Sequence, residues 1–203
     1  NFTYSGLNID AFNNIADIYI SNNMFDSAKL YLDKADEISK NHFFTLLTYA
    51  NYYRMKKDEL KKEIKNFELI LKLLLESKVN LFIDKTEYMS NEQKNGHLVW
   101  AYNNLGLIYL DKGDYNNSIE YFNNAIKIDD QMSSLYNNRY IANYELGNYD
   151  LCLADLNKSL EIAPYNAAGL YNRGNLRSDL GGDPYGAISD YTAAIEVIED
   201  PRY

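Results

Sequence analysis

The sequence predicts an all-α fold in which helix pairs stack into a solenoid. Three glycines, Gly113, Gly147 and Gly181, lie 34 residues apart. Three asparagines keep the same interval: Asn104, Asn138 and Asn172. A fixed period of this length indicates a repeat architecture, in which each copy forms one supersecondary unit and buries its apolar face against the next. The 203 residues include only three prolines, which leaves few helix breakers.

The clearest repeat spans residues 99–132. Apolar residues recur at helical spacing in both halves and are expected to fill the seam between two antiparallel helices: Leu105, Tyr109, Phe122 and Ile126. Gly106 and Ala125 lack bulk, so the two helices can approach closely. Gly113 is expected to end the first helix, and Asp114 to cap the second.

Upstream, residues 9–42 form a second repeat that matches without gaps, and residues 43–77 form a degenerate one with a longer second helix. Asn14 and Asn104 are 90 residues apart, which exceeds two periods by 22. We assign the excess to a connector at residues 78–91 and to an early start of the next helix. Ser90 and Gln93 have the spacing of a capping box.

Downstream, residues 133–166 and 167–201 keep the period. Tyr136, Gly147 and Tyr149 hold their register in the first of these repeats. The second carries one extra residue near Gly182, and Pro184 suits the first turn of its second helix.

The motif at residues 99–132 resembles the signature of tetratricopeptide repeat (TPR) proteins, with Tyr102 in the place of the usual tryptophan. The matching residues are Tyr102, Leu105, Gly106, Tyr109, Gly113, Tyr115, Ser118, Phe122 and Ala125. The resemblance implies one α-α superhelix over residues 1–203, with about five helix-turn-helix repeats and roughly ten helices. It also implies a concave groove lined by the first helix of each repeat.

By the same resemblance, the sixth place of each repeat faces the groove and holds asparagine in four repeats: Asn14, Asn104, Asn138 and Asn172. An amide offers one donor group and one acceptor, which match the polar groups of an extended peptide backbone. Neighbouring places complete the expected peptide-binding site with Trp100, Asn103, Asn137 and Tyr171. The alternative interpretation is that these asparagines have no role in binding, because asparagine is common at this place in the family and throughout this chain.

Trp100 has two interpretations. It is either an exposed anchor for a side chain of a partner or the residue on which the connector packs. We favour the connector, because an inserted segment must bury apolar surface to remain ordered.

Charge limits the choice of partner. The net charge of -9 has the wrong sign for nucleic acid or an anionic membrane. Chaperone-binding relatives hold an acidic tail with a lysine and arginine clamp, but the lysine places here are Asn103 and Ala168, and the arginine place is Asn172. The groove instead gathers acidic residues opposite a single arginine: Asp10, Asp17, Asp111, Glu145, Asp179 and Arg54. We therefore expect a neutral or basic peptide rather than an acidic one.

No motif for catalysis, metal binding or a cofactor is present. His42 and His97 are isolated, and Cys152 is interpreted as a small core residue. We predict no enzymatic activity, no metal and no cofactor. A single cysteine fits a reducing compartment, with the cytoplasm as the default, and no apolar run reaches the roughly 18 residues of a membrane span.

The leading hypothesis is a protein-protein interaction module, a scaffold or adaptor that holds an extended peptide in its groove. One alternative is a regulatory solenoid whose curvature responds to a signalling peptide. Another is the recognition domain of a larger enzyme, because a chain that begins at Asn1 rather than Met is expected to be a piece of a longer protein. The last helix is expected to leave Ile188, Tyr191 or Ile195 uncovered, which implies a missing segment or self-association.

Overall fold

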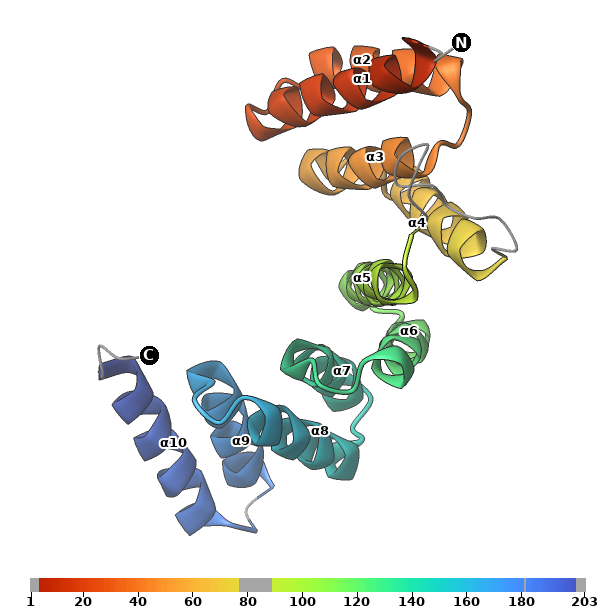
Figure 1. The fold of residues 1–203 in the computed structure, drawn as a ribbon. Helices are drawn as coiled ribbons and strands as arrows, with labels where there is room; N and C mark the ends of the chain where they lie inside the picture. The colour runs from red at the N-terminus through yellow and green to blue at the C-terminus, as the bar shows by residue number, and fades with distance from the viewer. Residues whose placement is uncertain (1–3, 77–88, 181, 200–203) are drawn as a thin grey trace. The chain divides into compact units, whose positions relative to one another are not determined.

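The computed structural model describes residues 4–76, 89–180 and 182–199, with side chains from residue 8 onward. These residues form ten α-helices and no strand, which confirms the predicted fold class (Figure 1). In chain order the helices are α1 (Tyr4–Ser21), α2 (Phe25–Ile38), α3 (Phe43–Lys56), α4 (Leu60–Leu75), α5 (Asn91–Asp111), α6 (Tyr115–Ile128), α7 (Ser133–Glu145), α8 (Tyr149–Ile162), α9 (Ala167–Asp179) and α10 (Pro184–Glu199).

The predicted helix ends are found at the turns. Gly113 and Gly147 adopt φ angles of 73° and 74°, a left-handed conformation that glycine enters without steric cost. The Asp114 side chain accepts from the backbone N–H of Asn117 and so caps α6. Pro184 is the first residue of α10. Gly181 lies outside the described residues.

The capping box before α5 is also present. The backbone N–H of Ser90 donates to Gln93 Oε1 at 2.8 Å, and that of Gln93 donates to Ser90 Oγ at 3.1 Å. This reciprocal pair satisfies two N–H groups that the start of a helix leaves without partners. Of the connector predicted at residues 78–91, residues 78–88 lie outside the described residues.

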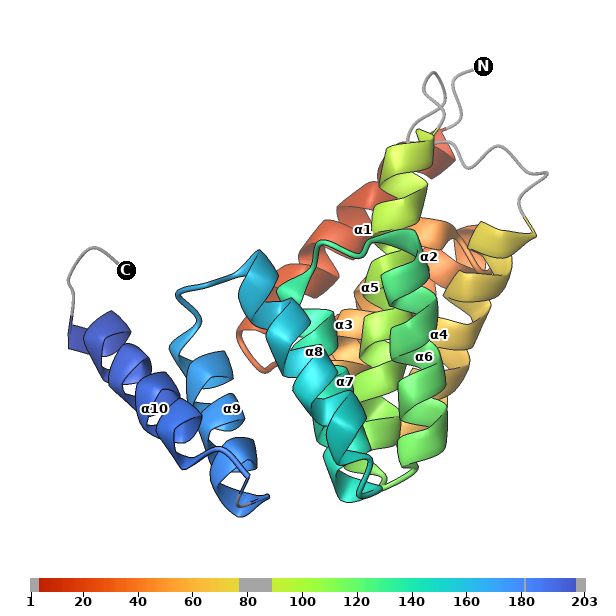
Figure 2. The ribbon, with the colours of Figure 1, turned by 90° about the horizontal axis from the view of Figure 1, so that it is seen from below.

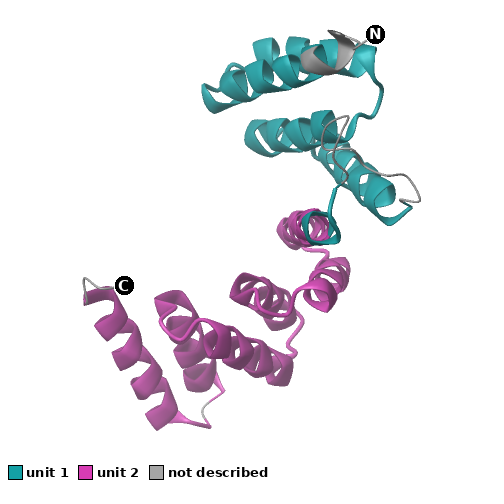
Figure 3. Cartoon of the chain, in the orientation of Figure 1, with its two compact units in different colours: residues 1–94 teal, residues 95–203 magenta. Residues whose placement is uncertain are grey.

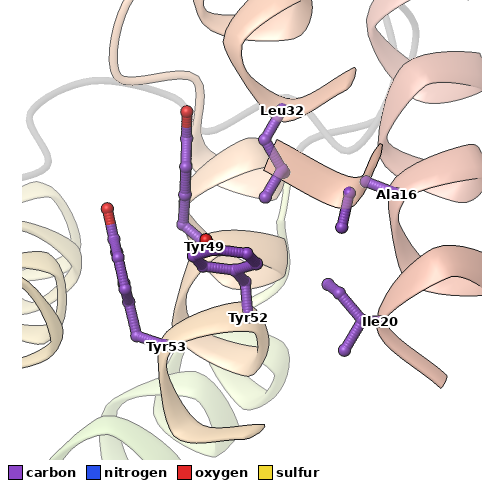
Figure 4. Close-up of a cluster of buried hydrophobic side chains, with 7 residues drawn as sticks. Ala16, Ile20, Leu32, Tyr49, Tyr52 and Tyr53 are labelled. Carbon is purple, nitrogen blue, oxygen red and sulfur yellow. The ribbon is translucent and has the colours of Figure 1, made fainter. Parts of the chain in front are cut away.

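The chain divides into two compact units, residues 1–94 and 95–203 (Figure 3). Unit 1 has an aromatic core. Ala16 and Ile20 of α1 and Leu32 of α2 pack with tyrosines of α3, as Figure 4 shows: Tyr49, Tyr52 and Tyr53. Two of these tyrosine rings, of Tyr49 and Tyr53, stack at 5.8 Å between centroids. The core therefore joins the first helix pair of unit 1 to the second.

Unit 2 contains most of α5, the whole of α6, and the helix pairs α7 with α8 and α9 with α10 (Figure 2). The seam between α5 and α6 is narrow: a Cβ added to Gly106 would lie 2.5 Å from a ring atom of Phe122. Ser118 Oγ donates to the Gly106 carbonyl at 2.8 Å across the same seam. Gly174 of α9 repeats the arrangement, since a Cβ there would lie 2.7 Å from Tyr191. Close approach of the paired helices therefore requires these two glycines.

Candidate functional site

The predicted site residues of unit 2 come from three first helices. Asn103 and Asn104 lie on α5, Asn137 and Asn138 on α7, and Tyr171 and Asn172 on α9. We refer to Asn104, Asn138 and Asn172 as the asparagine row. The row keeps one residue type at one place in three successive repeats, but its members differ in burial and in hydrogen bonding.

Asn138 links two repeats. Its Nδ2 group donates to Asn103 Oδ1 at 3.1 Å, so that an amide of α7 is joined to an amide of α5. Both side chains are half-buried. Within the described residues, Asn138 Oδ1 and Asn103 Nδ2 make no further hydrogen bond. The pair therefore retains one acceptor group and one donor group for another molecule.

Asn104 has a different environment. Its side chain is 6% exposed, and its Nδ2 group donates at 2.7 Å to the carbonyl of Trp100 in the same helix. A bond to the carbonyl four residues earlier holds the amide along its own helix. Asn104 thus has a structural contact that the sequence did not reveal.

Tyr171 is the most exposed of the predicted site residues in unit 2, and Asn172 lies next to it in α9. Tyr171 is 55% exposed, and its ring lies 5.8 Å from that of Tyr191. Asn172 is half-buried, and its amide makes no hydrogen bond to any described residue. An exposed aromatic ring beside a polar group without a partner is a suitable contact for a peptide.

The two remaining asparagines differ from each other. Asn137 is half-buried, and its Oδ1 atom is enclosed without a donor among the described residues. Asn14, in unit 1, is exposed, and its side chain makes no hydrogen bond to any described residue. All the other predicted site residues lie in unit 2.

Acidic residues border the first-helix face of unit 2 at the repeat interval. Asp111, Glu145 and Asp179 are all exposed and lie 34 residues apart. Tyr144 OH donates to Asp179 Oδ2 at 3.4 Å, which joins α7 to α9. The negative charge of Asp179 is the main cause of a raised pKa of Tyr144. The interval thus places one carboxylate at the last residue of each first helix in unit 2.

The structure contains two polar clusters that the sequence analysis did not predict. Arg139 donates from Nε to Asp155 at 3.2 and 3.1 Å, and from Nη1 to Asn123. One repeat later, the same three residue types recur as Arg173, Asp190 and Asn157. Each cluster joins an arginine of a first helix to the aspartate of its own pair and to the asparagine of the preceding pair. The 34-residue interval between the arginines was the signal that could have revealed them.

The remaining residues that the sequence analysis considered are the possible metal ligands, the two histidines and Trp100. No group of three or more His, Cys, Asp and Glu residues in the described part of the chain has the geometry to hold a metal ion. His42 and His97 have pKa values lowered by burial, which favours their neutral forms. Trp100 is half-buried, and the connector proposed to pack on it lies mostly outside the described residues. Among the described helices, none has the length and apolar character needed to cross a membrane.

Comparison with known proteins identifies the repeats. The tetratricopeptide repeat family matches residues 9–42 and 99–132, the two ranges that the sequence analysis assigned most clearly. A comparison with curated proteins gave no match.

Several solved structures share the fold at low sequence identity. MamA from Desulfovibrio magneticus RS-1, from residue 41 to its end, has a TM-score of 0.76 at 13% identity, over 97% of this chain and 98% of that one. A crystal structure of MamA has a TM-score of 0.71 at 19% identity, over 91% and 95%. YrrB, described as a TPR protein with an unusual peptide-binding site, has a TM-score of 0.66 at 18% identity, over 94% and 87%.

Proposed function

Because the chain is a tetratricopeptide repeat protein, we propose that it is an interaction scaffold that holds an extended peptide along the first helices of unit 2. The hydrogen bond between Asn138 and Asn103 carries the proposal. It fixes two amides of neighbouring repeats and leaves an acceptor on one and a donor on the other. A peptide backbone presents the complementary groups in every residue.

The proposed peptide is neutral or basic. Asp111, Glu145 and Asp179 place negative charge along the face at each repeat. Such a border attracts Lys and Arg side chains and repels acidic ones, with an effect that weakens as salt screens the charges. The peptide-binding description of YrrB supports a role of this kind for a protein of the same fold.

We propose no catalytic role for this chain. Among the described residues, the polar side chains of the predicted site and its acidic border are amides, acids and tyrosines, and no nucleophile is paired with a base there. Binding is therefore the function that these residues support.

The test compares partners captured from a lysate by the wild-type protein and by three variants. Asn172→Ala and Tyr171→Ala remove accessible groups, whereas Asn116→Ala is the control, because Asn116 is exposed on α6, a second helix. Asn104→Ala is unsuitable, since it would also remove the bond to the Trp100 carbonyl. We expect Asn172→Ala and Tyr171→Ala to lose partners that the control retains.

A segment shared by those partners is then synthesised and titrated by calorimetry. We expect Tyr171→Ala to weaken binding by about tenfold or more and added salt to weaken it further. Equal binding by the wild type and all three variants would exclude Tyr171 and Asn172 as contacts of the peptide. A preference for an acidic peptide would refute the charge assignment alone.

A further inference from the structure

The last helix carries an apolar stripe that unit 2 leaves uncovered. Tyr185, Ile188 and Ile195 of α10 are 84%, 60% and 55% exposed, and Thr192 between them is also exposed. On its other face α10 packs against α9 (Figures 1 and 2). Because the four residues are spaced by three, four and three, they lie on one side of the helix.

Inside unit 2, one position of the corresponding face of α8 is covered, whereas Asp150 and Asn157, which correspond to Tyr185 and Thr192, are exposed. Leu160 of α8 occupies the place that Ile195 has in α10, allowing for the extra residue near Gly182. Leu160 is only 6% exposed, because it packs with Leu170 at the start of the next helix pair. The position of Ile195 is therefore one that packs against another helix elsewhere in the same unit.

We propose that α10 pairs with α10 of a second copy of this chain, in an antiparallel arrangement about a two-fold axis. The order of spacings, three, four and three, is the same in both directions along the helix. An antiparallel partner therefore places Tyr185 opposite Ile195 of the second copy, and Ile188 opposite Thr192. Every residue of the stripe then meets another one, as an interface with two-fold symmetry requires.

Charge favours the antiparallel orientation over the parallel one. The exposed charged residues of α10 are Glu196 and Glu199, both in its last turn, and the helix contains no basic residue. In a parallel pair these glutamates would lie beside their own copies and repel. In an antiparallel pair they lie near the start of the partner helix, where the helix dipole favours negative charge. Asp183, at that end, is already paired with Arg177 at 3.4 Å.

The pairing is expected to be weak. One helix face on each side places the interface at the small end of specific interfaces, below about 1,200 Å² in total. We expect a monomer-dimer equilibrium with a dissociation constant on the order of 10 µM or above. The association does not depend on peptide binding by the first helices.

Sedimentation equilibrium over a range of concentrations tests the interface. We expect the wild type to dimerise reversibly and Ile195→Glu to remain a monomer. Leu151→Glu is the matched control, because Leu151 is also 55% exposed but lies on α8, and it should dimerise like the wild type. A wild type that stays monomeric up to about 1 mM would overturn the proposal.

Disulfide trapping tests the orientation. Tyr185→Cys and Ile195→Cys proteins are oxidised separately and as a mixture, and the buried native Cys152 serves as the internal control. The antiparallel pair predicts a crosslinked dimer in the mixture only, because each introduced cysteine lies opposite the other position. Crosslinking of each variant alone would indicate a parallel pair. Open-ended oligomers that persist in Ile195→Glu would indicate head-to-tail assembly instead, and either result overturns the proposed interface.

Discussion

Arg173 of α9 and Asp190 of α10 form two parallel hydrogen bonds, at 3.0 Å from Nε to Oδ2 and at 2.6 Å from Nη2 to Oδ1. Arg177, one turn later in α9, adds a third bond to the same carboxylate at 2.8 Å. The Asp190 side chain is only 4% exposed. A carboxylate with two arginines and little water holds its two helices in one relative position.

Replacement of Asp190 should be costly. Asp190→Ala leaves two partly buried guanidinium groups without their shared anion, and we expect a loss of about 3 kcal/mol in the free energy of unfolding. Urea denaturation followed by circular dichroism measures it. Glu161→Ala is the control, because Glu161 is 69% exposed in its pair with Lys158, and such a pair is worth less than about 1 kcal/mol. Equal losses in the two variants would show that the buried cluster contributes no more to stability than an exposed ion pair does.

The equivalent pair of the preceding repeat should show strong coupling. Asp155→Leu leaves Arg139 without its carboxylate, whereas Arg139→Leu with Asp155→Leu removes both charges. Leucine stands at the place of Arg139 in the repeat of residues 99–132, as Leu105. We expect the double variant to be more stable than Asp155→Leu alone, with a coupling energy of about 2 kcal/mol. Additive losses in a double-mutant cycle would contradict this.

The close approach of α5 and α6 predicts opposite effects for two glycine substitutions. Gly106→Ala places a Cβ 2.5 Å from Phe122, so we expect a loss of about 1–3 kcal/mol from overpacking. Gly96→Ala has open space around it in the same helix and should gain about 0.5–1 kcal/mol from helix propensity. Thermal unfolding compares the two. Restored stability when Phe122→Leu is added to Gly106→Ala would identify the ring as the cause.

In unit 1, the Tyr49 hydroxyl donates to Asp33 at 2.6 Å. Burial alone would raise the pKa of Asp33, but hydrogen bonds from Lys29 and Tyr49 outweigh it and hold the pKa below its usual value. A carboxylate with a lowered pKa stabilises the fold above the unfolded pKa, and this stability is lost as pH falls through the folded pKa.

Tyr49→Phe removes one of these bonds, so the pKa of Asp33 should rise. The acid-induced loss of stability linked to Asp33 should then be smaller and be complete at a higher pH. NMR titration of the aspartate carboxyl carbons measures the pKa directly. Tyr53→Phe is the control, because its ring stacks on Tyr49 but donates no bond to Asp33. An unchanged pKa in Tyr49→Phe would show that the bond does not set it.

Most of the fold could be predicted, because its signals are local or periodic. Gly113, Pro184 and the pair Ser90 with Gln93 mark helix ends through short-range backbone chemistry. The asparagine row was found by its interval, but its hydrogen bonds were not. An amide such as that of Asn104 can bond to its own helix or to another one, and only the packing decides which.

The arginine clusters were missed for a related reason. Arg139 and Asp155 are 16 residues apart on different helices, and both types are usually found at the surface. At the place of Asp155, the repeat of residues 99–132 has Tyr121, whose ring stacks on Tyr109 at 5.3 Å. The contact between the two helices of a repeat is thus made by aromatic stacking in one repeat and by an ion pair in the next. A family motif does not distinguish the two.

The segment of residues 133–166 contributes to the polar contacts with both of its neighbouring helix pairs. Toward the preceding helix pair, Arg139 donates a hydrogen bond to Asn123 Oδ1, and toward the following pair Asn157 Oδ1 accepts one from Arg173. An in-frame duplication of these 34 residues would therefore supply each new junction with its own asparagine and arginine. This part of the protein can lengthen by whole modules without a new interface, which is a route by which such arrays grow by gene duplication.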